Sequence, residues 1–186
     1  MRPTDPLLLV VLVGIPGSGK STFARTLLDG APAAGRRWRR ISQDVLGTRQ
    51  RCIKAAQKAV RSGENVLVDR CNFDAQQRSH WLQLGDAETT FDKRLAIYLP
   101  VPPEEARRRV LARGAHEGGV DTENMSAGKI ASIVARMQGD LVLPELNEGF
   151  DEVLVRVDGE DEETMDGVGS TEAVLERVWS LSSSDT

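Results

Sequence analysis

Apolar residues occur along this chain in short runs separated by polar and turn-forming residues. Residues 7–13 form a continuous aliphatic run between Pro6 and Gly14. Such a run is typical of a central parallel strand that is buried on both faces. Shorter runs predict further strands at residues 38–42, 65–69, 94–99 and 152–157.

Segments with helical spacing of apolar residues alternate with these strands. Helices are expected at residues 19–28, 48–61, 74–84, 102–112, 126–138 and 171–181. Asp74 is placed to cap its helix, and the two prolines and two acids at 102–105 are typical of a helix start. The alternation predicts a three-layer α/β fold with a five-stranded parallel sheet.

The pattern divides the chain into three parts. Residues 1–157 carry the alternating strands and helices and are long enough to form one domain with a core. Residues 158–170 are acidic and contain several glycines, which indicates a solvated linker or loop. Residues 171–186 are expected to form an amphipathic helix and a short tail.

A phosphate-binding sequence lies between the first strand and the first helix. The spacing Gly14-x4-Gly19-Lys20-Ser21 is that of the P-loop. Its glycines let backbone N–H groups turn towards phosphate oxygens at the positive end of a helix. Lys20 supplies a charge for the β and γ phosphates, and the Ser21 hydroxyl is a ligand for Mg²⁺. A glycine turn that binds nothing is the alternative.

We therefore expect a nucleoside triphosphate, ATP or GTP, together with Mg²⁺. The residues expected to bind the nucleotide are Gly14, Pro16, Gly17, Ser18, Gly19, Lys20, Ser21 and Thr22.

Two aspartates follow predicted strands and are expected at the same edge of the sheet. Asp69 closes the third strand beside the phosphate loop, where a carboxylate can orient Mg²⁺ or its waters. Asp44 follows the second strand and is placed to act as a proton acceptor for an attacking hydroxyl. Each could instead be a turn-forming or helix-capping residue.

Charge and composition narrow the class of partner only slightly. The net charge of -4 argues against bulk electrostatic binding of nucleic acid, but arginines cluster at 36–40 and 107–109 and leave room for a local basic cleft. The longest apolar run is too short to span a membrane, which needs about 20 residues. With no targeting signal identified, we expect a nuclear or cytoplasmic location.

Several segments, taken in order, resemble polynucleotide 5′-hydroxyl kinases. They are the phosphate loop at 13–23, the segment after the second strand at 43–52, the third strand with its loop at 66–74, and Glu148-Gly149-Phe150 before the last strand. The chain resembles the kinase domain of eukaryotic kinase–phosphatase end-healing enzymes and the kinase-like domain of plant aprataxin-like proteins. The resemblance covers about residues 7–157.

The resemblance implies a P-loop kinase fold with an arginine-bearing lid and a role for each matching residue. Asp44, Lys20 and Arg113 are implied as catalytic residues, with Asp44 accepting the proton of the 5′-OH. Arg109 and Arg113 are implied in nucleotide binding. Asp44, Arg51, Arg70 and Asn72 are implied on the acceptor side, and Ser21 and Asp69 at the metal. Gly47 and Leu111 depart from the family, which has arginine at these positions in some members.

The sequence therefore predicts an ATP-dependent polynucleotide 5′-hydroxyl kinase acting on DNA or RNA ends, with a fused or partner domain possible beyond the acidic segment. A kinase of small molecules such as a nucleoside or sugar is the main alternative, since the fold serves many acceptors. A module that only binds the triphosphate and a GTPase-type hydrolase remain as further alternatives.

Overall fold

A six-stranded parallel sheet forms the centre of the computed structural model, which describes residues 5–31, 35–85, 90–112, 126–157 and 167–182. The strands are β1 (Leu8–Val13), β2 (Trp38–Ser42), β3 (Asn65–Asp69), β4 (Lys93–Tyr98), β5 (Glu152–Arg156) and β6 (Val168–Gly169), in the spatial order β2-β3-β1-β4-β5-β6. Every pair is parallel. All the carboxyl ends therefore meet at one edge of the sheet.

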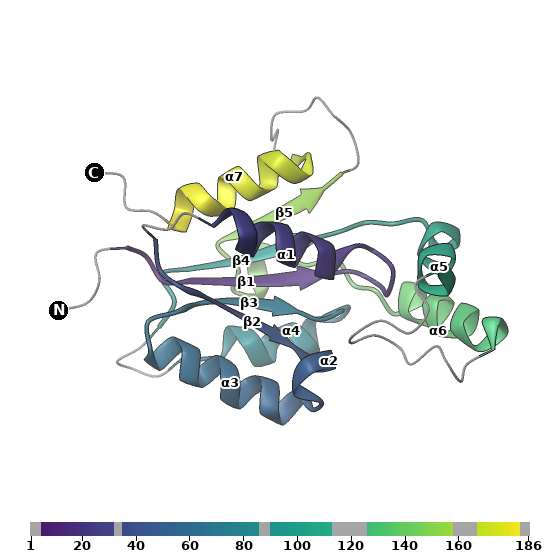
Figure 1. Ribbon diagram of the computed structural model, residues 1–186, viewed down its shortest axis with the longest axis horizontal. Coiled ribbons are helices and arrows are strands. Elements are labelled where there is room, and N and C mark those ends of the chain that lie inside the picture. Colours follow the sequence, from purple (N-terminus) through teal and green to yellow (C-terminus); the bar gives the residue numbers. More distant parts are fainter. Residues whose placement is uncertain (1–4, 32–34, 86–89, 113–125, 158–166, 183–186) are drawn as a thin grey trace.

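Helices cover both faces of this sheet (Figure 1). They are α1 (Lys20–Gly30), α2 (Gln43–Leu46), α3 (Arg49–Arg61), α4 (Ala75–Leu82), α5 (Pro103–Ala112), α6 (Ala127–Gly139) and α7 (Thr171–Ser182), with a 3₁₀ turn at Leu146–Glu148. Helices α1 and α7 lie on one face and α3 and α4 on the other, while α5 and α6 lie beyond the carboxyl edge. The three-layer P-loop kinase fold is confirmed.

The central strand β1 supplies both halves of the core. All six of its residues are buried. Leu9, Val11 and Val13 pack with the α3 and α4 side, whereas Val10 and Leu12 pack with the α1 and α7 side. The continuous aliphatic run thus reflects a strand that is covered by helices on both faces.

Local signals set several of the helix ends. The Asp74 side chain accepts a hydrogen bond from the Gln77 N–H and caps α4, as the sequence predicts. Thr48 and Ser126 cap α3 and α6 in the same way. The one-turn helix α2, which carries Asp44, was not predicted, because four residues are too few for a helical pattern to be visible.

The sheet has six strands where the sequence predicts five. Strand β6 falls inside the expected acidic linker and pairs with β5, with the Val155 N–H donating to the Gly167 carbonyl. A two-residue strand has no alternation to detect, so the sequence could not indicate it. Helix α7 packs Val174 and Val178 into the core of the same sheet and so belongs to the domain. Residues 158–166 lie outside the described residues.

None of the helices described in the structure is long and apolar enough to cross a membrane.

Candidate active site at the carboxyl edge of the sheet

The loop between β1 and α1 has backbone conformations that only glycine adopts readily. Gly17 has φ +86° and Gly19 has φ +91°. A Cβ atom on Gly17 would lie 2.5 Å from the carbonyl oxygen of Ala106 in α5. The same loop is fixed to the neighbouring strand, because the Gly14 N–H donates to the Cys71 carbonyl at 3.0 Å. Thus both the shape of the loop and its close approach to α5 require these glycines.

Two side chains at the start of α1 face this loop and the adjacent strand. Lys20 is 8% exposed, and its ammonium group donates to the Ile15 carbonyl at 2.7 Å and to Ser18 Oγ at 3.2 Å. Ser21 Oγ lies 3.5 Å from Asp69 Oδ1 at the end of β3. The structure therefore brings together the cation, hydroxyl and carboxylate that the sequence assigns to the nucleotide and its metal. Pro16 is half-buried on the loop, and Thr22 is exposed.

The side-chain oxygen atoms of Ser21 and Asp69 are of the type that binds a magnesium ion. Hydroxyl and carboxylate oxygens are the ligands that Mg²⁺ takes in kinase sites, where phosphates and waters supply the rest of the coordination shell. Within the described residues there is no group of three or more metal-ligating His, Cys, Asp or Glu side chains. Ser21 and Asp69 would thus hold the ion together with the nucleotide.

Arg40, which the sequence analysis did not single out, forms an ion pair with Asp69. Arg40 Nη2 lies 2.5 Å from Asp69 Oδ2, and Asp69 is only 4% exposed. Arg40 is on the same face of β2 as Trp38 and Ser42, and Ser42 is paired with Asp69 in the sheet register. Side chains alternate between the two faces of a strand, which places Arg40 on the face covered by α1. This alternation is the sequence signal by which Arg40 could have been predicted at the site.

Asp44 lies on α2, the helical turn that follows β2, and is exposed to solvent. Partial burial of its carboxyl group raises the pKa, and the charge of Asp69 raises it further. The charges of Lys20, Arg40 and Arg70 act in the opposite direction. The carboxyl group of Asp44 therefore experiences the charges of both the phosphate loop and the neighbouring strand.

Arg70 and Arg51, both implied on the acceptor side, lie directly after β3 and on the first turn of α3. The Arg70 guanidinium stacks over the ring of Trp81, 5.6 Å from its centroid. Burial lowers the pKa of Arg70 from its ordinary value, although such a group stays protonated at neutral pH. Arg51 is exposed on the first turn of α3, and its Nη1 would lie 3.7 Å from a Cβ placed on Gly47.

Asn72, implied as a substrate-binding residue, occupies a buried position on the loop after β3. Its side-chain amide donates to the carbonyls of Leu12 and Arg70, and its Oδ1 accepts from Trp81 Nε1 at 2.9 Å. It is fully buried and has φ +45°. With these contacts, Asn72 fixes the loop that carries Arg70 against β1.

The loop containing Asn72 is also held by a buried ion pair. Arg78 is fully buried and forms a two-point pair with Glu148, with distances of 2.7 and 2.6 Å. It also donates to the carbonyls of Asn72 and Val142. This pair joins α4, the loop after β3 and the segment that returns from α6, a link between distant parts of the chain that the sequence does not reveal.

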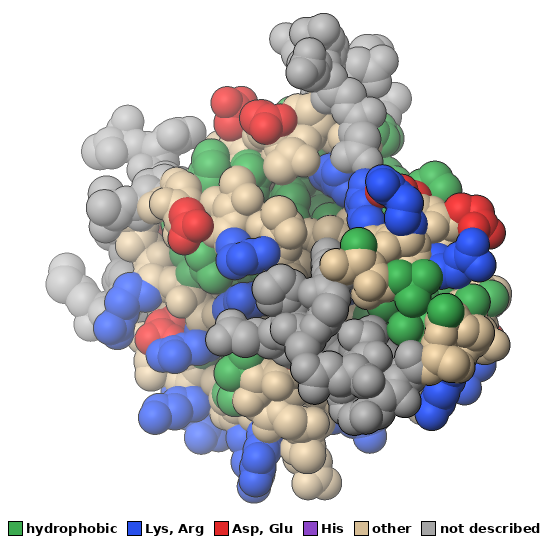
Figure 2. Space-filling model, turned by 45° about the vertical axis from the view of Figure 1, so that its right-hand side comes forward, with side chains coloured by type: hydrophobic (Ala, Val, Ile, Leu, Met, Phe, Trp, Pro, Cys, Tyr) green, Lys and Arg blue, Asp and Glu red, His purple; other side chains and the backbone are tan. Residues whose placement is uncertain are grey.

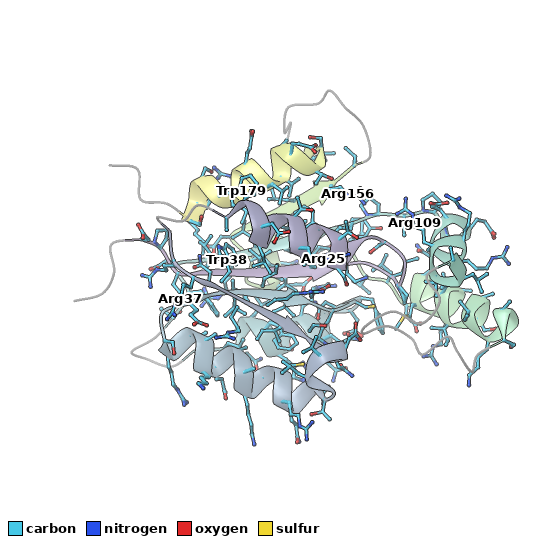
Figure 3. All side chains as sticks on the ribbon, viewed as in Figure 1. Arg25, Arg37, Trp38, Arg109, Arg156 and Trp179 are labelled. Carbon is cyan, nitrogen blue, oxygen red and sulfur yellow. The ribbon has the colours of Figure 1, made fainter. Side chains whose placement is uncertain are left out.

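Two further arginines approach the phosphate loop from other elements (Figure 3). Arg109 on α5 is held by Glu105 at 2.6 Å and lies 3.5 Å from the Gly17 carbonyl. Arg156, at the end of β5, donates to the Ser18 carbonyl at 3.3 Å and is 8% exposed. The position of Arg109 fits its implied nucleotide-binding role, and Arg156 was missed by the sequence analysis. Arg113, implied as a catalytic and nucleotide-binding residue, lies outside the described residues.

Comparisons with known proteins bear on this site. The sequence profile of a family described as an AAA domain matches residues 9–139. The chain is 38% identical over 152 residues to the transcription factor bHLH140 of Arabidopsis thaliana, and 31% identical over 145 residues to the bifunctional polynucleotide phosphatase/kinase of Schizosaccharomyces pombe. The resemblance to the kinase domain of polynucleotide kinase–phosphatases is thereby confirmed.

These two matches cover 79% and 78% of the chain, but only 16% and 32% of the relatives. The chain therefore matches only a part of each of these longer relatives.

Solved structures agree on the fold. A fungal RNA kinase superposes with a TM-score of 0.68 at 18% identity, covering 95% of this chain and 85% of that one. Kti12 of Chaetomium thermophilum in complex with ADP-AlF3 superposes with a TM-score of 0.65 at 20% identity, covering 94% and 99%. At these identities the likeness shows a shared fold.

Proposed function

The chain belongs to the AAA domain family, and from that premise we propose that it is a polynucleotide 5′-hydroxyl kinase. It transfers the γ-phosphoryl group of ATP, or of another nucleoside triphosphate, to the 5′-OH end of DNA or RNA. A P-loop kinase is the coarser description that the family and the fold support directly. The acceptor and the catalytic base are the parts that we propose.

The reaction assigns one task to each group at the carboxyl edge. The 5′-hydroxyl oxygen forms a bond to the γ phosphorus, the bond from this phosphorus to the bridging oxygen breaks, and the nucleoside diphosphate leaves. Asp44 accepts the hydroxyl proton, and Lys20 stabilises negative charge on the phosphates. Ser21 and Asp69 would hold Mg²⁺, which would supply positive charge beside the phosphates when bound.

Arginines complete the arrangement on both sides of the transferring group. Arg109 approaches the phosphate loop from α5 and is held there by Glu105. Arg70 stands on the acceptor side, where its guanidinium can bind the first phosphate of a strand. In this proposal Asn72 acts through Arg70, by fixing the loop that carries it.

The observation that carries the proposal is the position of Asp44 on α2, directly after β2, whose last residue, Ser42, is paired with Asp69 beside the phosphate loop. Burial and the Asp69 charge raise the pKa of Asp44, and the Lys20 charge lowers it. A carboxylate with a raised pKa beside the phosphate loop is the group a kinase needs to accept a proton from an attacking hydroxyl.

A panel of acceptors tests the proposal. The enzyme is incubated with γ-labelled ATP, Mg²⁺ and equal concentrations of a 5′-OH oligonucleotide, the same oligonucleotide with a 5′-phosphate, a nucleoside and a simple sugar. We expect label on the 5′-OH oligonucleotide alone. Transfer to the nucleoside or sugar instead would establish a small-molecule kinase. Release of phosphate with no labelled acceptor would establish a hydrolase, and either result would overturn the proposal.

A further inference from the structure

Helix α3 presents a stripe of four basic side chains to solvent. Arg51, Lys54, Lys58 and Arg61 are all exposed and recur at intervals of three and four residues, which places them on one face of the helix. The opposite face is buried through Cys52, Ala56, Ala59 and Val60. From Arg51 to Arg61 the stripe extends about 15 Å along the helix axis.

The charges of this stripe are not balanced by acids. Residues 36–61 contain nine arginines and lysines and a single acid, Asp44, in a chain whose net charge is -4. Among the described residues, none of the four stripe side chains has a carboxylate partner within ion-pair distance. A concentrated positive charge in a chain that is acidic overall indicates a surface that binds a polyanion, and not one that is only solvated.

Helix α5 shows what a solvated basic helix looks like in the same molecule. Arg107 pairs with Glu104, and Arg108 and Arg109 pair with Glu105. Hydrogen bonds from Arg108 and Arg109 lower the pKa of Glu105 to about 2. Arg107 and Arg108 of α5 are thus neutralised within their own helix, whereas the cations of α3 are left for an external anion.

The stripe starts at the acceptor side of the site. Arg51, its first member, lies next to Gly47 and is separated from Asp44 by the turn that joins α2 to α3. From there α3 runs antiparallel to the strands, away from the carboxyl edge (Figure 1). Lysine and arginine side chains gather over the lower part of the molecule in Figure 2, on the side where α3 lies.

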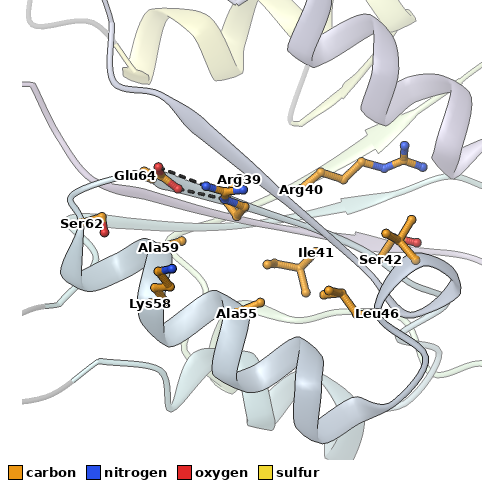
Figure 4. Close-up of a pocket in the computed structure, with 11 residues that line it drawn as sticks. Arg39, Arg40, Ile41, Ser42, Leu46, Ala55, Lys58, Ala59, Ser62 and Glu64 are labelled. Atoms are coloured by element: carbon orange, nitrogen blue, oxygen red, sulfur yellow. Dashed lines mark hydrogen bonds and ion pairs between the residues drawn. The ribbon is translucent and has the colours of Figure 1, made fainter.

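An apolar pocket opens beside the stripe (Figure 4). It has a volume of about 400 Å³ and lies between the free edge of β2 and α3. Ile41, Ala55 and Ala59 contribute its apolar wall, and Lys58 of the stripe is on its rim. Val45, which is 78% exposed, lines the pocket next to Asp44. Apolar surface bordered by cations suits a nucleobase attached to its phosphate.

We propose that α3 and the β2–α3 pocket bind the acceptor strand beyond its first nucleotide, with phosphates on Lys54, Lys58 and Arg61 and a base against the pocket. This rests on the proposed function, since Asp44 fixes where the 5′ end lies. The substrate class is then a single-stranded end of several nucleotides. A dinucleotide would use only the residues around Asp44.

The test compares acceptors of two lengths in matched variants. Lys54→Gln/Lys58→Gln is the stripe variant, and Lys93→Gln, an exposed lysine at the start of β4, is the control. We measure kcat/KM with a dinucleotide and with a 5′-OH strand of about 12 nucleotides, and binding of the longer strand by fluorescence anisotropy at several salt concentrations.

We expect the wild type and the control to prefer the longer strand at least tenfold and the stripe variant to lose that preference while using the dinucleotide normally. The slope of log Kd against log salt should fall by about 0.7 for each neutralised cation. Equal losses with both acceptors, or an unchanged salt slope, would overturn the inference. If no acceptor is phosphorylated by the wild type, the proposed function fails, and the binding measurement still decides whether α3 binds a strand.

Discussion

The phosphate loop and the proposed acceptor edge lie side by side at the carboxyl ends of the strands, but the chain builds them differently. The donor half is a continuous segment, Gly14 to Thr22, in which glycine backbone and a helix start form the site. The acceptor half is assembled from side chains of β2, α2, the loop after β3, and α3. A contiguous site depends on local conformation, whereas an assembled one depends on packing, so the two halves should respond differently to substitution.

The largest expected effect is on the rate of phosphoryl transfer, and it should distinguish the acceptor half of the site from the donor half. Asp44→Asn should lower the rate of transfer roughly 10²- to 10⁴-fold, because the proton acceptor is lost. Affinity for ATP, measured by calorimetry, should stay within about twofold, because no donor-side contact is removed. Lys20→Met is the matched variant on the donor side and should lower both the rate of transfer and the affinity for ATP. A fall in ATP affinity for Asp44→Asn would show that the halves are not separable.

The second effect is on stability and concerns the buried ion pair that holds the loop after β3. Arg78→Met removes one partner of a pair in which Arg78 is 0% and Glu148 13% exposed. A charge left in such surroundings should cost about 3–5 kcal/mol of unfolding free energy in urea titrations. Arg177→Met breaks the more exposed Arg177–Glu152 pair and should cost at most about 1 kcal/mol. Equal losses would contradict the bracing role of Arg78.

A third, smaller effect should be confined to the donor half. In Gly17→Ala the new methyl group meets the Ala106 carbonyl at 2.5 Å in a positive-φ conformation. We expect ATP affinity to weaken and unfolding free energy to fall by about 1–3 kcal/mol. Gly139→Ala, in α6 with nothing within 4 Å of the added atom, should be neutral or stabilising by up to about 1 kcal/mol. Identical behaviour of the two variants would argue against close packing of the loop on α5.

The smallest effect is a change in pH dependence on the acceptor side. The Arg70 charge lowers the pKa of Asp44, so Arg70→Gln should raise that pKa. The base acts when ionised, and the acidic limb of the kcat/KM profile should therefore move to higher pH. Arg37→Gln, exposed at the other end of β2, should leave the limb where it is. A shift to lower pH would mean that the acidic limb does not report the ionisation of Asp44.

The difference between a continuous site and an assembled one also explains which features could be predicted from the sequence. The strand at residues 65–69 and the P-loop were predicted at their observed positions, because a buried parallel strand and a glycine-rich turn leave contiguous patterns. Asp44 and Asp69 were placed at one edge because parallel strands end together.

Other parts of the site depend on contacts that a linear pattern does not record. Arg40 needs the register of β2 against β3, Arg156 needs the placement of β5 beside the phosphate loop, and Asn72 needs its partner Trp81. The short elements α2 and β6 fall below the length at which periodicity is visible.

The central claim is that the γ-phosphoryl group goes to the 5′-hydroxyl of a nucleic-acid strand, and locating the label in the product tests it most directly. A 5′-OH oligonucleotide is incubated with the enzyme and γ-labelled ATP and then digested to nucleoside monophosphates. The account predicts that all the label is recovered in the 5′-monophosphate of the terminal nucleotide. Label found as inorganic phosphate, at an internal position or at the 3′ end would contradict it.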